Sequence, residues 1–348
     1  MASKNVEKTR ARLEKRFVPA CLPDVLSTPV PFCTKRAHRI EEGAYYEAHQ
    51  QLRVVSQRYI KARNYSAAVD ILCSGAEALL KAGQNSSGCD LCLMLVGVYK
   101  AGNIAPSATS RARLIQLISL ISPEEPSRKR FINEVITWSS KHGEYPAGDP
   151  ELHHFIGNLL AQEDDTYEAE KHLVVGTKES VETFADMLYE WYTEDEPNTA
   201  PMYAARAVFP YMLIGNLRDA TRLLTTFTRK LIENNPSLTV QEVQTASVDA
   251  KVIPSMPLLN LLNLLLLACQ TGGQDMFRTL KSHYSNSLKE VPHWNEALEQ
   301  VGETYFGIQV RRPASIFDMM GSMLGGAPNA APQSRQIAPE QQPFADLD

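Results

Sequence analysis

The sequence predicts an all-α protein, an α-solenoid of paired helices interrupted by one β-hairpin near residues 238–253. A recurring helix-entry phrase and the helical periodicity of apolar residues lead to this prediction. The phrase joins a turn-forming or small polar residue to a large ring or Leu, with Ala following within three residues. In stacked helical hairpins the bulky side chain fills the gap between hairpins, and Ala lets two helices approach closely. The phrase occurs at irregular spacing, in 43–48, 62–67, 165–169 and 215–220, which indicates divergent, TPR-like repeats.

Most helices are predicted by apolar residues that recur at three- and four-residue steps. Gly83–Gly88 predicts a loop between two of them, because Gly, Asn and Ser favour turns. Asp149 predicts an N-cap, with Pro150 at the first helical position. The expected helices cover residues 45–63, 65–82, 89–100, 107–120, 124–142, 151–162, 166–175, 178–193, 199–214, 216–234, 258–271, 273–289 and 293–307.

The pattern changes in 238–243 and 246–253, where β-branched residues alternate with polar ones and predict two short strands. The two ends of the chain also differ from the repeats. We expect residues 1–34 to form a poorly ordered basic arm, because four prolines interrupt them. We expect 35–325 to form a single solenoid and 326–348 to be a disordered tail, which is rich in Pro and lacks apolar periodicity.

Charge is distributed unevenly along the chain. The formal net charge is −5, but residues 1–63 carry 13 Lys+Arg and only 6 Asp+Glu. The basic residues are spread along predicted helices and do not line a groove with stacking aromatics. We therefore expect a protein partner rather than a nucleic acid.

No segment has the pattern of a signal peptide or a membrane span. The N-terminus lacks an apolar core. The most apolar run, Leu258–Cys269, is short and contains Asn260 and Asn263, so it should not cross a bilayer. We expect a cytosolic chain with reduced thiols and no stable membrane insertion.

Candidate chemical sites are weak. Cys89 and Cys92 have C-x-x-C spacing but no second ligand pair, although Cys73 lies on the preceding helix; buried packing is the simpler interpretation. His153-His154 is interpreted as structural, because adjacent side chains on a helix diverge and do not easily share a metal. The acidic residues of 163–170 lack calcium-loop spacing and are interpreted as a solvated face. No nucleophile with a base is present, so we expect neither an enzyme nor a cofactor.

Several segments together are typical of one family: Glu42–Gln50, Arg58-Tyr59, Cys89–Leu91, Gly148–Pro150, Tyr167–Glu170, Leu267–Gln270 and Tyr305–Ile308. From about Lys35 to Gly326 the chain resembles the Golgi-to-ER traffic protein four family, the thirty-five-kilodalton subunit of the transmembrane-domain recognition complex. The resemblance implies an α-solenoid with an inserted β-hairpin. It also implies a non-catalytic scaffold that helps to deliver tail-anchored membrane proteins to the ER. In that family the N-terminal helices dock onto a targeting ATPase. The C-terminal helices and hairpin bind a ubiquitin-like adaptor subunit, and a co-chaperone and clients are reached indirectly.

Two sets of contact residues are expected. Asp90 matches an acidic position that the family uses toward the ATPase, whereas Gly97 stands where the family often has another acidic residue. Tyr46 belongs to the ATPase set, although the repeat pattern favours packing for it. The expected ATPase-binding residues are Tyr46, Gln50, Arg53, Arg58 and Asp90. The expected adaptor-binding residues are Val240, Val243, Val248, Val252, Tyr305, Phe306, Phe317 and Met320, the last two from a Met-rich segment that would pack against the adaptor or the last hairpin.

Two alternatives remain at this point. One is a helical-repeat scaffold of another cytosolic complex, such as a proteasome-lid-like or signalosome-like subunit. The other is a metal-dependent enzyme built around Cys73, Cys89 and Cys92.

Overall fold

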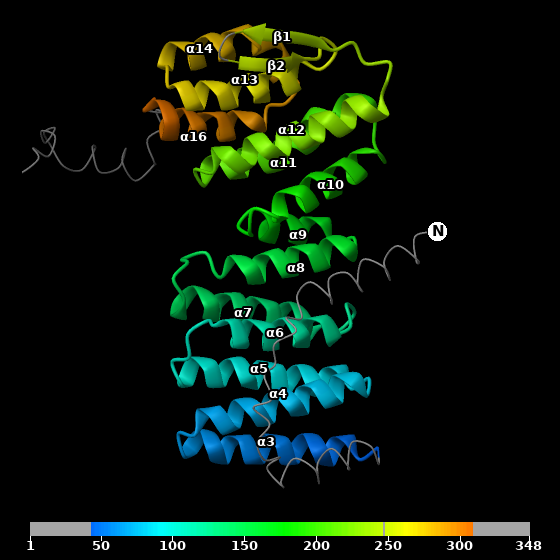
Figure 1. Cartoon of the computed structure of the whole chain (residues 1–348), viewed down its shortest axis with the longest axis vertical. Coiled ribbons are helices and arrows are strands. Elements are labelled where there is room, and N and C mark those ends of the chain that lie inside the picture. The colour runs from blue at the N-terminus through cyan, green and yellow to red at the C-terminus, as the bar shows by residue number, and fades with distance from the viewer. Residues whose placement is uncertain (1–42, 246–247, 309–348) are drawn as a thin grey trace, which may run out of the picture. The chain divides into compact units, whose positions relative to one another are not determined.

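The computed structural model describes residues 43–245 and 248–308. All of them except Ile308 belong to one compact unit. Within this unit each helix contacts the helices one or two positions along the chain, as α3 does with α4 and α5, so the helices stack in chain order (Figure 1). The helices are α3 (Tyr45–Lys61), α4 (Tyr65–Lys81), α5 (Asn85–Ala101), α6 (Ala108–Leu120), α7 (Ser127–His142), α8 (Pro150–Gln162), α9 (Thr166–Leu173), α10 (Ser180–Tyr192), the short 3-10 helix η1 (Pro197–Thr199), α11 (Ala200–Leu213), α12 (Leu217–Asn234), α13 (Pro257–Thr271), α14 (Gln274–His283), α15 (Ser285–Leu288) and α16 (Trp294–Phe306).

The prediction of an all-α solenoid is confirmed, and three of the four entry phrases bury their Ala, whereas Ala67 is half-buried. Ala48, Ala169 and Ala220 are fully buried. The turn residues also behave as expected, because Gly215 and Arg63 adopt the left-handed conformation that ends a helix. The bulky residue is less regular: Tyr167 is 61% exposed, so it does not fill a gap between hairpins.

The predicted loop Gly83–Gly88 is wrong in its length. α4 ends at Lys81 and α5 already begins at Asn85, so Gly88 lies inside a helix. A Cβ on Gly88 would lie 2.6 Å from the Leu80 side chain. The glycine therefore serves the close approach of α4 and α5 rather than a turn. Two other helix predictions differ at their ends. The helix expected from 124 begins at Ser127, after Pro126, and the one expected over 273–289 is divided between α14 and α15.

The two predicted strands form an antiparallel hairpin of β1 (Gln241–Thr245) and β2 (Val248–Val252), which are the only strands in the described residues. Thr245 pairs with Val248, and Gln241 pairs with Val252. The buried Asn260 of α13 fixes the end of β2, because its side chain accepts from the Ile253 backbone N–H at 2.9 Å and donates to the Ile253 carbonyl at 2.7 Å. One amide side chain thus satisfies both backbone groups of a residue between the hairpin and α13.

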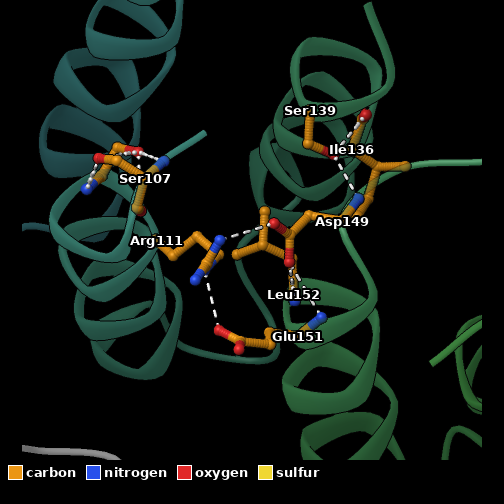
Figure 2. A network of polar contacts seen from close by, with 8 residues as sticks. Ser107, Arg111, Ile136, Ser139, Asp149, Glu151 and Leu152 are labelled. Atoms are coloured by element: carbon orange, nitrogen blue, oxygen red, sulfur yellow. Dashed lines mark hydrogen bonds and ion pairs between the residues drawn. The ribbon is translucent and has the colours of Figure 1, made fainter. Parts of the chain in front are cut away.

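A polar network joins α6, α7 and α8 at the predicted N-cap (Figure 2). Asp149 accepts from the backbone N–H groups of Glu151 and Leu152 at 2.9 and 3.3 Å, which confirms its capping role. Its other oxygen lies 3.1 Å from Arg111 Nη1, and Arg111 Nε lies 2.9 Å from Glu151 Oε2. Ser139 of α7 accepts from the Asp149 N–H at 3.1 Å. The network therefore holds three successive helices at one point.

The acidic residues of 163–170 are only in part the solvated face that the sequence indicates, because Asp164 and Asp165 are exposed but the three glutamates are half-buried in ion pairs. Glu163 accepts two hydrogen bonds from the buried Arg128 of α7, at 2.6 and 2.9 Å. Glu168 pairs with Lys129 and Lys171, and Glu170 pairs with Arg206 of α11. The cations come mostly from helices far along the chain, which periodicity within one helix does not reveal.

His153 belongs to a buried pair and is structural, as expected. Its Nδ1 lies 2.9 Å from His172 Nδ1, and its Nε2 lies 3.1 Å from the Ala147 carbonyl. A carbonyl only accepts, so Nε2 carries the proton and the neutral ring accepts at Nδ1 from His172. Burial lowers the pKa of His153 and lowers the pKa of His172 to about 4, which keeps both rings neutral at pH 7.

Candidate protein-binding surfaces

The first candidate surface is one side of α3, which we call the α3 face. Tyr46, Gln50, Arg53, Gln57 and Lys61 recur at three- and four-residue steps and therefore share this side of the helix. The buried side of the helix carries Ala48, His49, Leu52 and Ser56. A hollow of about 470 Å³ is lined by Gln50, Arg53, Val54, Gln57, Arg58 and Lys61.

Positive charge dominates the α3 face. Within the described ranges, Arg58 and Lys61 have no carboxylate partner, and both side chains are exposed. Val54 is half exposed and lines the hollow beside these cations, whereas Tyr46 is 75% exposed near the other end of α3. The expectation that Tyr46 packs inside the repeat is wrong. The buried side of α3 consists of Ala48, His49, Leu52 and Ser56, and Tyr46 falls outside it.

Asp90 of α5 is held against α3 rather than presented alone. Its Oδ2 lies 2.9 Å from His49 Nε2 and 3.3 Å from Arg53 Nη1. The carboxylate side chain is 39% exposed, so a partner can still reach it. The structure thus brings together four of the five residues expected to bind the ATPase, because Gln50, Arg53 and Arg58 line one hollow and Asp90 contacts Arg53. Tyr46 lies about one turn before Gln50 on the same helix and does not line the hollow. Gly97 is exposed, and a Cβ placed on it would meet no neighbouring atom.

The second candidate surface is the end of the unit formed by the hairpin, α13, α14 and α16 (Figure 1). Val240 and Val252 are half-buried there, and Val243 and Val248 lie on β1 and β2. Phe317 and Met320 lie outside the described residues.

Tyr305 and Phe306 support this end from within. The Tyr305 hydroxyl donates to the Met212 carbonyl at 2.6 Å, next to the end of α11. Phe306 is buried and stacks on Phe277 of α14, with ring centroids 4.8 Å apart. The Phe306 carbonyl accepts from the Gln274 side chain at 2.6 Å. Phe306 therefore shapes the surface through packing, because its ring is not accessible to a partner.

Sequence reasoning missed His49, Val54, Lys61 and Asn260. The spacing of Lys61 from Gln57 and Val54 is a usable signal for the shared face. His49 and Asn260 gave no such signal, because each acts through a residue on another element.

The metal-dependent alternative concerns Cys73, Cys89 and Cys92, which are free thiols. Within them, no group of three or more His, Cys, Asp or Glu side chains is arranged to hold a metal ion. Burial raises the pKa of the Cys89 thiol to about 11 and also raises that of Cys92. In the part of the chain that the structure describes, no helix is long and apolar enough to cross a membrane.

Comparison with known proteins identifies the family. The family model described as Golgi to ER traffic protein 4 matches residues 62–324. Golgi to ER traffic protein 4 of Aspergillus fumigatus is 50% identical over 309 residues, covering 85% of this chain and 89% of the relative. The Schizosaccharomyces pombe protein of that name is 31% identical, covering 86% of this chain and 97% of the relative. The crystal structure of C. therm. Get4 matches with a TM-score of 0.75 and 45% identity, over 93% of this chain and 96% of that one. The chain therefore belongs to the Golgi to ER traffic protein 4 family.

Proposed function

We propose that this chain is a non-catalytic scaffold in the cytosol that helps to deliver tail-anchored membrane proteins to the ER. In this proposal the α3 face binds a targeting ATPase, and the end formed by the hairpin, α13, α14 and α16 binds a ubiquitin-like adaptor subunit. Membership of a Golgi-to-ER traffic family supports a role in ER traffic. It also disfavours a lid-like or signalosome-like subunit, which would belong to another family.

The observation that carries the ATPase part is the chemistry of the α3 face. Arg58 and Lys61 supply positive charge that no described carboxylate neutralises. Tyr46 supplies an exposed aromatic ring, and such rings often anchor protein interfaces. A surface of this kind fits an acidic patch on a partner, with the cations steering the encounter and the ring supplying affinity.

Asp90 has a different role in this proposal. Arg53 already balances its charge in the free chain, and His49 fixes its position. A basic side chain of the ATPase could replace Arg53 as the partner of Asp90, which keeps the acidic contact that the resemblance implies. Asp90→Lys should weaken ATPase binding by about 1–3 kcal/mol, because the new Lys would lie beside Arg53 and would repel the basic side chain of the ATPase.

The proposal that the adaptor binds the hairpin end is supported by the position of the hairpin beside the last helices of the solenoid. A solenoid end exposes apolar surface unless something covers it. Val240 precedes β1 and Val252 ends β2, and both are only half-buried in the free chain. We propose that the adaptor covers this end. Tyr305 and Phe306 hold the underlying helices together, through a hydrogen bond to Met212 and a stacking contact with Phe277.

The experiment is equilibrium binding of the ATPase and of the adaptor to full-length variants. Arg58→Glu with Lys61→Glu should weaken ATPase binding about tenfold or more and should make it less sensitive to salt. Arg130→Glu with Lys141→Glu is the matched control, since both residues are exposed on α7. Adaptor affinity should stay unchanged in both variants. Equal loss of ATPase binding in the control, or none in the α3 variant, would remove the α3 face from the proposal.

A further inference from the structure

A third surface lies between the two already described, on α9, α10, α11 and the start of α16. Side chains from these helices line an open groove of about 540 Å³. This lies within the range of roughly 300–1,000 Å³ typical of binding pockets. We call it the aromatic groove and define it by Tyr167, Trp191, Tyr203, Arg206, Phe209 and Trp294.

The groove already shows how it holds a cation. The Arg206 guanidinium lies 5.0 Å from the Tyr167 ring centroid and 4.7 Å from the Trp191 ring centroid. Its Nη2 donates to Glu170 Oε2 at 2.7 Å, and its Nε donates to the other carboxylate oxygen. Arg206 is thus stacked and neutralised within the chain. Tyr167 remains 61% exposed, so most of its surface is open to a second group.

An acidic segment reaches the groove at Asp195, which is one of the lining residues. The segment that follows α10 contains Glu194, Asp195 and Glu196, all exposed. Asp195 accepts from the Tyr203 hydroxyl at 3.0 Å and from the Glu196 backbone N–H at 2.8 Å. The hydrogen bond from the Glu196 N–H has the larger effect, and both bonds lower the pKa of Asp195, so its carboxylate is ionised at neutral pH. Among the described residues, no cation pairs with Glu194 or Glu196.

We propose that the aromatic groove binds a basic, extended segment of a partner protein. One Lys or Arg side chain of that segment stacks on the open surface of Tyr167, as Arg206 stacks on its other side. A neighbouring cation pairs with Glu194 or Glu196 at the rim. Apolar side chains between them contact Met202 and Pro210, which line the groove and are half-buried.

The charge of the groove selects this occupant. Arg206 and Glu170 cancel, so the uncompensated charge in the lining is Asp195, and the exposed Glu194 and Glu196 adjoin it in the chain. An acidic peptide would be repelled by them, and a purely apolar helix would leave the carboxylates without partners. The proposed site uses neither the α3 face nor the hairpin, and it shares only the start of α16 with the proposed adaptor-binding end.

The probe is an array of short synthetic peptides in which basic, acidic and uncharged polar residues are permuted around a constant apolar framework. Full-length protein should retain peptides that carry at least two basic residues. The best binder, labelled with a fluorophore, is then titrated by anisotropy. Glu194→Lys with Glu196→Lys should weaken its binding about tenfold or more and reduce its salt dependence. Tyr167→Ala should weaken peptide binding about fivefold, because it removes the ring on which the basic side chain stacks. Its circular dichroism should stay unchanged, because the ring is exposed.

Glu124→Lys with Glu144→Lys is the control, since both residues are exposed and lie outside the groove. This control should bind the peptide as the wild type does. The proposal is overturned if the array shows no preference for basic peptides, or if the control loses binding equally. Two further results would also overturn it: uncharged apolar peptides that bind regardless of Glu194 and Glu196, or self-association of the chain that Tyr167→Ala abolishes.

Discussion

The ion pair between Arg128 and Glu163 should be among the most costly polar contacts to break. It joins α7 to the end of α8, in the middle of the described helices. The Arg128 side chain is 6% exposed and that of Glu163 is 21% exposed, and two hydrogen bonds of 2.6 and 2.9 Å connect them. Substitution Glu163→Met leaves a buried guanidinium without its carboxylate.

Removing one partner of a buried pair costs about 3–5 kcal/mol, because the remaining charge stays in an environment that does not solvate it. Glu163 keeps some exposure, so water can partly replace it, and we expect about 3 kcal/mol. For a chain of this size that corresponds to roughly 4–6 °C in melting temperature. Replacing both residues by Met should restore most of the loss, because neither charge is then buried.

The assay is urea unfolding of the wild type, the two single variants and the double variant, followed by circular dichroism. Glu233→Ala is the control, because Glu233 pairs with Arg229 on the surface of α12, with both side chains more than half exposed. It should cost less than about 1 kcal/mol. The reasoning is refuted if Glu163→Met costs no more than Glu233→Ala, or if the double variant is as unstable as the single ones.

Three other buried groups lead to predictions. Because the pKa of His172 is about 4 in the folded chain and about 6.5 when unfolded, stability present above pH 6.5 should be lost as pH falls toward 4, by up to about 3 kcal/mol; urea midpoints against pH should flatten in His172→Gln, and an unchanged slope would contradict this. Phe306→Ala should cost about 3–5 kcal/mol in thermal unfolding, whereas Phe306→Leu should cost less than about 1.5 kcal/mol and keep full adaptor affinity; a folded Leu variant that no longer binds the adaptor would make the ring a direct contact. Cys89, with a pKa of about 11, should react with iodoacetamide at pH 8 about a hundredfold more slowly in the native chain than in urea, measured by mass spectrometry; equal rates would disprove the burial.

Periodicity within one segment was enough to predict the fold. The spacing of apolar residues predicted the helices, and alternating β-branched residues predicted β1 and β2. Asp149 and Pro150 were recognised because capping uses only neighbouring residues. Gly88 misled the prediction because glycine serves both turns and close helix contacts, and only the position of Leu80 distinguishes them.

The candidate surfaces were harder to predict, because they depend on residues from different helices. Helical spacing placed Tyr46 and Arg53 on one helix, but only packing shows that Tyr46 is exposed. The link from Asp90 to His49 spans 41 residues, and the link from Glu163 to Arg128 spans 35. The aromatic groove combines four helices in the same way, so no single segment of the sequence contains its pattern.

The central claim is that this scaffold carries two separate binding surfaces, one on α3 and one at the hairpin end. Its most direct test is the mass of the complex formed by the full chain, the targeting ATPase and the ubiquitin-like adaptor, measured by light scattering after size-exclusion chromatography. The account predicts one complex that contains all three proteins, from which Arg58→Glu with Lys61→Glu removes only the ATPase. Displacement of the adaptor by the ATPase, or loss of both partners in that variant, would contradict it.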